Sequence, residues 1–393
     1  MRRTEALQGV RTIKFLSILS RCEAAEFSQV EAAELLGVGE RTFRRWRQRH
    51  ADDGGAGLLD RRLGKASGKR VPIDREAEVE ALYRIRYAGF TAKHLHEHLV
   101  RDHDFAWGYT WTKALSSFER LAGAGRAARG ASAQAAARRP MPGMMLHQDG
   151  SKHEWLSGQP ALDLIVTLDD ATSAILSAFL VEEEGTASTF RALEEVFGRH
   201  GLPLSLYTDR GSHYFHTPEA GGKVDRTRLT QAGRALDHLG VELSRPIRRK
   251  REARSERVFQ TLQDRLTKEL ALAAGIATIE AANAFIRDVY VPAHNARFAR
   301  HAEQEGSAFV AIPGVDLGEI LCVQEERQVG NDNCVSFNRL KPQIPESPLR
   351  AHFVKARVKV RQYHDGTHAI FHGPGCLGRY DDKGALRHEK MAA

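Results

Sequence analysis

The chain has 393 residues, which is enough for two to four domains with cores of their own. Its net charge of +8 at pH 7 favours a polyanionic partner, and nucleic acid is the commonest one. None of the 4 cysteines stands in a C-x-x-C pair, which argues against a disulfide framework and a cysteine-bound zinc ion. We see no signal peptide and no apolar run long enough to cross a membrane, so we expect a cytoplasmic protein without a membrane partner.

Residues 1–60 have the pattern of a helix-turn-helix, which follows an apolar helix and runs from Ser28 to His50. Ser28 is a suitable N-cap, and Gly37 can adopt the positive φ of a tight turn. Phe43 and Trp46 would pack inward. Because arginines concentrate on the second helix, we interpret its outer face as a DNA-binding surface rather than an ordinary solvated face. The side chains expected to enter the major groove are Arg41, Thr42, Arg44 and Arg45.

Residues 61–122 combine a glycine-rich basic linker with a second helical unit. Residues 123–142 form another basic linker, rich in alanine, arginine and glycine. The cations of the first linker would neutralise phosphates and follow a DNA groove as an arm. They include Arg61, Arg62, Lys65 and Arg70.

Two histidines of the second helical unit have a spacing that deserves a test for metal binding. His94 and His98 lie at positions i and i+4, so one helix face could present both to an ion. No H-E-x-x-H pattern accompanies them, and exposed polar histidines are the commoner case. We therefore predict that they bind no metal.

Residues 143–300 show a change of periodicity that indicates an α/β domain. In chain order they predict three strands, a helix, a strand, a helix, a short strand and a long helix. This is the order of an RNase H-like fold. The fold class is thus multidomain, with N-terminal all-α helix-turn-helix units and a central α/β RNase H-like catalytic domain.

Three carboxylates fall where this fold would bring them together. Asp149 and Asp209 each end a predicted strand, and Glu256 opens the long helix. The two strands are neighbours in the fold, so their ends converge, and the helix brings Glu256 alongside. The helix would be held there by apolar residues at helical spacing. These are Phe259, Leu262, Leu266 and Leu270.

Such a set suits the cleavage of phosphodiester bonds. In-line displacement needs positive charge near the attacking and the leaving oxygen, and two Mg²⁺ ions about 4 Å apart supply it. Mg²⁺ prefers oxygen ligands and keeps several waters, so a few carboxylates suffice. We therefore predict Asp149, Asp209 and Glu256 as catalytic ligands of two Mg²⁺ ions, for which Mn²⁺ could substitute.

Three segments that contain these acids resemble the catalytic segments of one family. HQDGSKHEWL, YTDRGSHY and RSERVFQTLQDRL are similar to those of integrase-core (rve-type) DDE transposases of bacterial insertion sequences, of the ISNCY type. The head, GLLDRR and DGTHAIFHGPGCLGRY are similar too, so the resemblance covers nearly the whole chain. It implies that the three acids are a DDE triad. It also implies a nucleoid-associated bacterial protein that works as a homodimer or a larger homo-oligomer.

The turn before Glu256 departs from the family pattern. The family has a short glycine-containing basic turn there, whereas this chain reads SRPIRRKREARSERV. Glu252 is therefore a rival third ligand. We favour Glu256 because the S-E-R-x-F-x-T-L-Q run matches best and Ser255 could cap the helix.

The other charged residues around the predicted site either suit structural positions or would help to bind DNA. Asp169 and Asp170 suit a turn between two strands, and Glu269 suits a solvated or salt-bridged position. Cations beside the acids would neutralise phosphates. They are Arg210, Arg248, Arg249, Lys250, Arg251 and Arg257.

Residues 301–393 predict a linker followed by a small β-barrel, which is SH3-like by resemblance. A strand is expected over 328–338, with further alternating segments after it, and His364-Asp365-Gly366 suits a hairpin turn. This domain would bind DNA or another protomer.

The expected function is that of a transposase that binds insertion-sequence ends, cleaves their 3′ ends and joins them to target DNA. A non-catalytic DNA-binding regulator derived from a transposase is the alternative, but it would be under no pressure to keep all three acids. A nuclease that only hydrolyses is disfavoured, because it needs no module that recognises ends.

Overall fold

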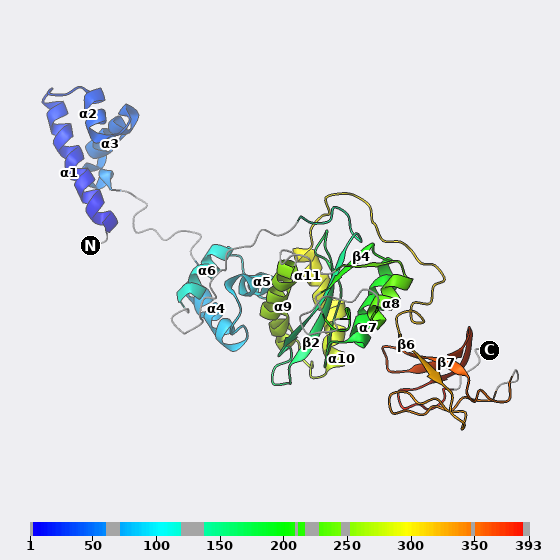
Figure 1. The fold of residues 1–393 in the computed structure, drawn as a ribbon. Helices are drawn as coiled ribbons and strands as arrows, with labels where there is room; N and C mark the ends of the chain where they lie inside the picture. The colour runs from blue at the N-terminus through cyan, green and yellow to red at the C-terminus, as the bar shows by residue number, and fades with distance from the viewer. Residues whose placement is uncertain are drawn as a thin grey trace. The chain divides into compact units, whose positions relative to one another are not determined.

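The computed structural model describes residues 3–59, 71–118, 137–208, 211–216, 228–244, 252–346 and 350–387 (Figure 1). The chain divides into two compact units, Met1–Ala81 and Leu82–Ala393, which are described separately below. None of the helices in the described ranges is both long and apolar enough to cross a membrane.

The first unit contains three helices that pack around a small aromatic core. They are α1 (Arg3–Glu23), α2 (Gln29–Leu36) and α3 (Glu40–Asp53), followed by the short 3₁₀ helix η1 (Gly54–Leu58). Ser28 caps α2 in a capping box with Glu31, and Gly37 ends it with a φ of 65°. Phe15 and Phe43 are buried against each other, with ring centroids 5.7 Å apart. The sequence therefore predicted the helices and the turn of the head correctly.

The next helices are α4 (Ile73–Ile85), which crosses the boundary between the units, and then α5 (Ala92–Asp102) and α6 (Tyr109–Phe118). Thr91 caps α5 by accepting a hydrogen bond from the backbone of His94. His96 Nδ1 on α5 lies 3.0 Å from the Thr112 hydroxyl oxygen on α6, and this hydrogen bond joins the two helices.

The second unit is built on a five-stranded mixed sheet (Figure 1). Its strand order is β3-β2-β1-β4-β5. The central strand β1 runs antiparallel to β2 and parallel to β4, so the predicted neighbours are indeed paired. The strands are β1 (Leu146–His153), β2 (Leu162–Asp169), β3 (Ile175–Val181), β4 (Ser205–Thr208) and β5 (Glu242–Ser244).

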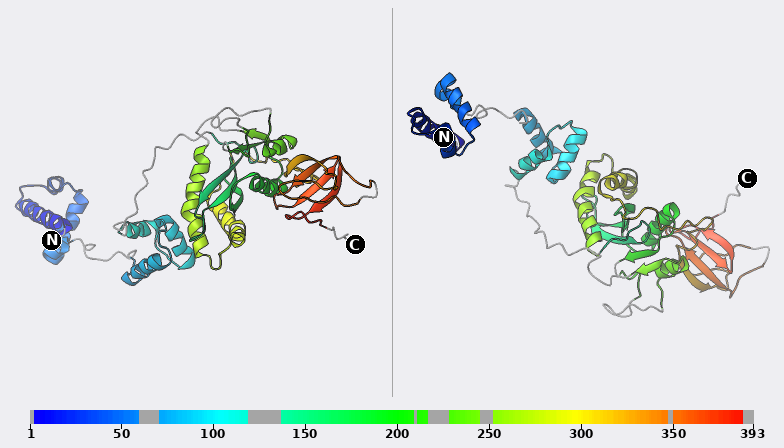
Figure 2. Two further views of the ribbon diagram at one scale, coloured as in Figure 1. Left: turned by 60° about the horizontal axis from the view of Figure 1, so that its bottom comes forward. Right: turned by 90° about the horizontal axis from the view of Figure 1, so that it is seen from above.

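Helices cover both faces of this sheet (Figure 2). On one face, α7 (Thr186–His200) and α8 (Gln231–His238) pack on Leu146 and Leu206. The other face is covered by α9 (Glu252–Leu272), α10 (Ile279–Phe285), the π-helical turn η3 (Ile286–Tyr290) and α11 (Val291–Phe298). Every residue of β2 is buried because the strand is covered on both sides. The RNase H-like arrangement expected from the sequence is thus the architecture of this unit.

The tail is a four-stranded antiparallel sheet rather than a closed barrel. Its order is β6-β7-β8-β9, which leaves β6 and β9 at the edges of the sheet within the described residues. The expected strand over 328–338 is wrong, since that segment makes only isolated bridges and the strand precedes it. The strands are β6 (Val323–Gln328), β7 (Arg357–Gln362), β8 (His368–His372) and β9 (Gly375–Tyr380).

The tail is joined to the central sheet by polar contacts. Glu319 forms ion pairs with Arg361 of β7 and Arg379 of β9. Gln231 of α8 exchanges two hydrogen bonds with the backbone of Gln324, at 2.9 and 3.0 Å.

Candidate active site

Asp149 lies in the central strand of the sheet, on the face covered by α9. Side chains alternate along a strand, so Asp149 shares its face with His147 and Ser151, while Leu146 points to the core under α7 and α8. Asp149 is half-buried, and its Oδ1 accepts a hydrogen bond from the Gly150 backbone at 3.0 Å. The carboxylate is therefore fixed by its own strand at the edge of the buried core.

The second predicted ligand, Asp209, lies outside the described residues, as does Arg210. The residue before it, Thr208, ends β4 and is the partner of Gln148 in the parallel pairing with β1. Gln148 in turn precedes Asp149. The pairing therefore confirms that β1 and β4 bring the residues before the two acids side by side, and the position of Asp209 itself stays a prediction.

The expectation that Ser255 caps the long helix and Glu256 opens it is wrong, because α9 already begins at Glu252. Glu256 lies within the first turns of α9, and its side chain is exposed. Phe259, Leu262, Leu266 and Leu270 are buried in the core between α9 and the sheet, as the helical spacing predicted. Further along α9, Gln263 donates a hydrogen bond to the Ser151 hydroxyl of β1 at 3.1 Å. Glu256 lies two turns before Gln263, on the same side of the helix. Glu252 is the first residue of α9, but its side chain lies outside the described residues.

Glu184 was not singled out by sequence reasoning, yet its carboxylate packs against the residue that follows Asp149, on the opposite face of β1. A Cβ built on Gly150 would lie 2.2 Å from Glu184 Oε2, so this carboxylate packs directly on the residue after Asp149. The imidazole of His213 is 3.4 Å from Glu184 Oε1. The glycine of the HQDG segment was the available signal, because a glycine beside a functional acid often allows close approach of another group.

The paired acids at the end of β2 form a turn, as expected. Asp169 accepts hydrogen bonds from the backbone of Gly143 at 2.9 Å and of Thr172 at 2.8 Å. Asp170 accepts from the Arg139 backbone at 2.6 Å and lies 2.8 Å from His147 Nε2. Both are 2% exposed, so they serve the structure of the turn.

The predicted DNA-binding side chains of α3 divide into two groups. Arg41 and Arg44 are exposed, and Arg44 pairs with Glu40 of its own helix. Thr42 and Arg45 line a groove against α1, in a hollow of about 560 Å³ that also includes other cations. In the second unit, Arg257 is exposed on α9. Outside the described residues lie Arg61, Arg62, Lys65, Arg70, Arg248, Arg249, Lys250 and Arg251.

His94 and His98 are not exposed, contrary to the expectation. They are 1% and 2% exposed, and both contact Glu269 of α9. Burial favours the protonated form of Glu269, but the bonds to the two imidazoles outweigh it and lower its pKa to about 2. Glu269 is therefore an ionised carboxylate, and the two histidines face the interior of the unit.

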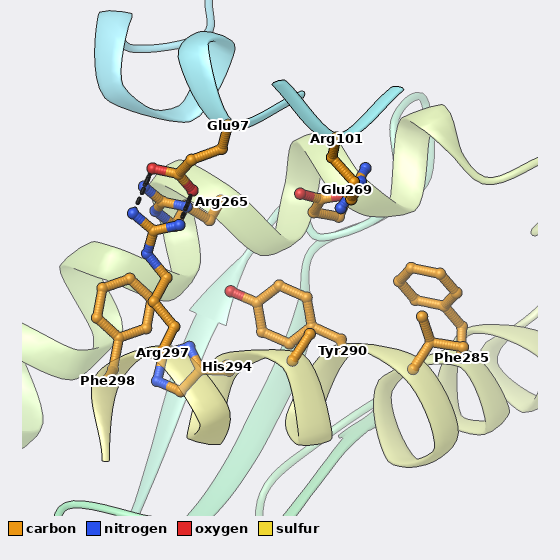
Figure 3. Close-up of a pocket in the computed structure, with 11 residues that line it drawn as sticks. Glu97, Arg101, Arg265, Glu269, Phe285, Tyr290, His294, Arg297 and Phe298 are labelled. Atoms are coloured by element: carbon orange, nitrogen blue, oxygen red, sulfur yellow. Dashed lines mark hydrogen bonds and ion pairs between the residues drawn. The ribbon is translucent and has the colours of Figure 1, made fainter. Parts of the chain in front are cut away.

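A cavity of about 130 Å³ adjoins this cluster between α5, α9 and the helices η3 and α11 (Figure 3). On one side, Glu97 forms ion pairs with Arg265 and Arg297, and on the other lie Arg101 and Glu269 (Figure 3). The Tyr290 hydroxyl and His294 Nδ1 are buried there without a hydrogen-bond partner among the described residues. Burial lowers the pKa of His294 to about 4, so its imidazole is neutral near pH 7.

The strand order and the helices that cover both faces of the sheet give the second unit an integrase-core-like, RNase H-like fold. No family model matches the chain. It is 29% identical over 364 residues to a Sinorhizobium fredii (strain NBRC 101917 / NGR234) protein named as a transposase, covering 91% of this chain and 78% of the relative. It is also 29% identical over 232 residues to the transposase for insertion sequence IS1202 of Streptococcus pneumoniae, covering 58% of this chain and about half, 49%, of that relative. The chain is thus a relative of insertion-sequence transposases, and the resemblance inferred from the three segments is confirmed.

Solved structures give a weaker likeness. The catalytic core of HTLV-2 integrase, solved with magnesium, matches with a TM-score of 0.28 and 17% identity over 38% of this chain and 91% of that one. A chain of the simian T-cell lymphotropic virus intasome, solved with a PP2A regulatory subunit, matches with a TM-score of 0.33 and 14% identity over 79% of this chain and 98% of that one. These scores are too low to carry an argument, so the class rests on the sheet order and the sequence relatives.

Proposed function

We propose that this chain is a DNA transposase that binds the ends of its insertion sequence, cleaves their 3′ ends and joins them to target DNA. The proposal is carried by one observation. The central strand places Asp149 on the face covered by α9, and α9 carries Glu256 on the side that bonds to that strand. The transposase relatives support the same function.

The acids fit a site for two Mg²⁺ ions, or for Mn²⁺ in their place. The Asp149 and Glu256 side chains offer only oxygen donors. Asp149 is half-buried and Glu256 is exposed, so a metal site between them would remain open to water and to DNA. Asp209 would complete the ligand set. When bound, the ions would supply positive charge to the attacking and leaving oxygens of the phosphodiester. The chain itself would hold Asp149 through β1 and Glu256 through the buried face of α9.

The remaining parts suit the handling of DNA. Arg41 and Arg44 present exposed cations on α3, which suits entry of that helix into a major groove, and Arg257 lies one residue after Glu256. Synapsis of two ends would require a homodimer or a larger homo-oligomer. The regulator alternative gains no support of its own, because the chain retains Asp149 and Glu256 and their positions on β1 and α9 suit the catalytic proposal.

The test is cleavage of a labelled duplex that carries an end of the element, in Mg²⁺, in Mn²⁺ and in EDTA. The variants are Asp149→Asn, Asp209→Asn and Glu256→Gln. Metal ligands contribute several kcal/mol to such a reaction, so each variant should lose roughly a thousandfold in rate, while the parent is active only with metal. Two matched controls, Glu252→Gln and Glu154→Gln, should retain activity.

Three outcomes are informative. Loss of activity in Glu252→Gln but not in Glu256→Gln would move the third ligand to Glu252. Full activity of Asp209→Asn or Asp149→Asn would overturn the mechanism. Specific binding of the end by the parent with no cleavage in either metal would favour the regulator.

A further inference from the structure

A cluster of two histidines and one glutamate joins α5 to α9 at a distance from the proposed catalytic acids. His94 Nε2 lies 2.7 Å from Glu269 Oε1, and His98 Nε2 lies 3.0 Å from the same oxygen. All three donor atoms are within 4.8 Å of one another. Glu269 follows Glu256 by almost four turns of α9, about 20 Å along the axis, so this cluster is a separate site.

We propose that His94, His98 and Glu269 bind a Zn²⁺ ion that clips α5 to α9. Two imidazoles and one carboxylate are a ligand set that zinc accepts, whereas Mg²⁺ prefers oxygen donors alone. The two histidines lie one turn apart on α5, so their rings face the same direction, with centroids 5.1 Å apart. This site is independent of the proposed transposase function.

The spacing of the donors suits the ion with a small adjustment. Zinc binds nitrogen and oxygen at about 2.1 Å, so tetrahedral ligands lie about 3.4 Å from one another. The two Nε2 atoms must therefore move away from Glu269 Oε1 by about half an ångström. The Glu269 side chain is 20% exposed on the cavity side, so it has room to make that shift.

A second carboxylate lies where zinc sites usually have one. Asp102 Oδ2 is 2.9 Å from His98 Nδ1, the ring nitrogen that points away from Glu269. Ligating histidines commonly donate this second N–H to a carboxylate, which fixes the tautomer and orients the ring. Arg101 donates to Asp102 at 2.7 and 2.8 Å, and its Nη2 also donates to His98 Nδ1 at 2.8 Å. Zinc binding therefore requires Arg101 to release His98 Nδ1, so that this nitrogen can donate its N–H to Asp102.

In the tautomer in which His98 Nδ1–H donates to Asp102, the lone pair of His98 Nε2 faces Glu269 Oε1 at 3.0 Å, so both atoms are directed at the position that the ion would take. The cavity of about 130 Å³ that adjoins Glu269 has room for a water molecule to complete a four-coordinate zinc.

The test measures zinc binding by the full chain in excess Mg²⁺, which keeps the proposed catalytic acids occupied. A chromophoric chelator competes for Zn²⁺, and Co²⁺ serves as a probe through its visible absorption. We expect one high-affinity Zn²⁺ per chain and a tetrahedral Co²⁺ band. Glu269→Gln and His98→Ala should weaken binding more than tenfold, and Asp102→Asn about 10- to 100-fold.

Matched controls separate this site from folding and from other histidines. His96→Ala, on the same helix, and Asp149→Asn should bind zinc as the parent does. His94→Gln keeps a hydrogen-bond donor for Glu269 but removes one imidazole, so it should fold normally and lose zinc. Unchanged affinity in both His94→Gln and Glu269→Gln, or the absence of a tetrahedral Co²⁺ band in the parent, would show that the cluster is only a hydrogen-bonded contact.

Discussion

At the scale of single residues, Gly150 shows how closely the chain packs beside the predicted catalytic acid. Its position next to Asp149 leaves no room for a side chain, because the Glu184 carboxylate occupies the space. The obstructing atoms are the end of a flexible side chain, so the space can be reopened without moving the backbone. This contact can therefore be tested without destroying the fold.

Gly150→Ala should lower the free energy of unfolding by about 1 kcal/mol, because it displaces the Glu184 carboxylate on the face of the sheet opposite to Asp149. Thermal melting of the full chain measures the effect. Glu184→Ala removes the obstacle, so in that background Gly150→Ala should cost little stability. An equal cost in both backgrounds would mean that the contact with Glu184 is not the cause.

The histidines of α5 show what single-residue reasoning could not reach. AKHLHEHLV has the composition of a solvated helix, but His94 and His98 are buried by the nearby ring of Phe90 and by Glu269, more than 170 positions later in the chain. Glu269 in turn was expected to be solvated or salt-bridged. Local sequence carries no information about such a long-range partner, so the burial of these residues emerged only from the fold.

At the scale of elements, α9 depends on its buried stripe for the placement of Glu256. Phe259, Leu262, Leu266 and Leu270 fill the core against the sheet, while Glu256 and Arg257 before them are exposed. The helix is therefore anchored by its middle rather than by the end that carries the predicted ligand.

Leu266→Ala should lower the free energy of unfolding by about 2 to 5 kcal/mol, because it leaves a cavity in this core. Urea denaturation of the full chain measures the change. Val289→Ala is the control, since Val289 is 54% exposed on η3 and should change stability by less than about 0.5 kcal/mol. A cost for Leu266→Ala as small as that of the control would contradict the packing described for α9.

Elements with strong periodicity were predictable, and elements stabilised by distant pairing were not. β2 and β3 are apolar runs, and the stripe of α9 repeats at helical spacing, so their types follow from local pattern. β6 reads VQEERQ, which has no apolar alternation, because it is an edge strand held by its backbone pairing with β7. The strand that carries Asp149 was predictable, but the expectation that Asp149 ends this strand is wrong, because β1 stays paired with β2 as far as His153. The approach of Glu184 was signalled only by the glycine after Asp149.

At the scale of the whole molecule, the contact between the tail and α7 makes stability depend on pH. His364 Nε2 lies 2.9 Å from Glu194 Oε2, and this hydrogen bond raises the pKa of His364 above its usual 6.5. Because the pKa of His364 is higher in the folded chain than in the unfolded chain, the contact stabilises the folded state fully at pH values below the unfolded-state pKa. This stabilisation is lost as the pH rises through the folded-state pKa of His364.

The melting temperature should therefore fall slightly as the pH rises above 6.5, the usual pKa of histidine, by an amount that corresponds to less than about 1 kcal/mol for this partly exposed pair. His364→Gln should remove that slope. His301→Gln changes an exposed histidine of the same unit and should leave the slope unchanged. A parent slope that survives in His364→Gln would assign the pH dependence to other groups.

The anchoring of α9 by its middle has a consequence for how such a chain can change in evolution. Each residue of a helix turns the side chain by roughly 100°, so one residue lost between Glu256 and Phe259 would rotate the glutamate away from β1 while the buried stripe stays in register. Length changes before Glu252 would leave that register intact. Copies of this element should therefore tolerate insertions and deletions upstream of the helix and lose activity through a single codon gained or lost between Glu256 and Phe259.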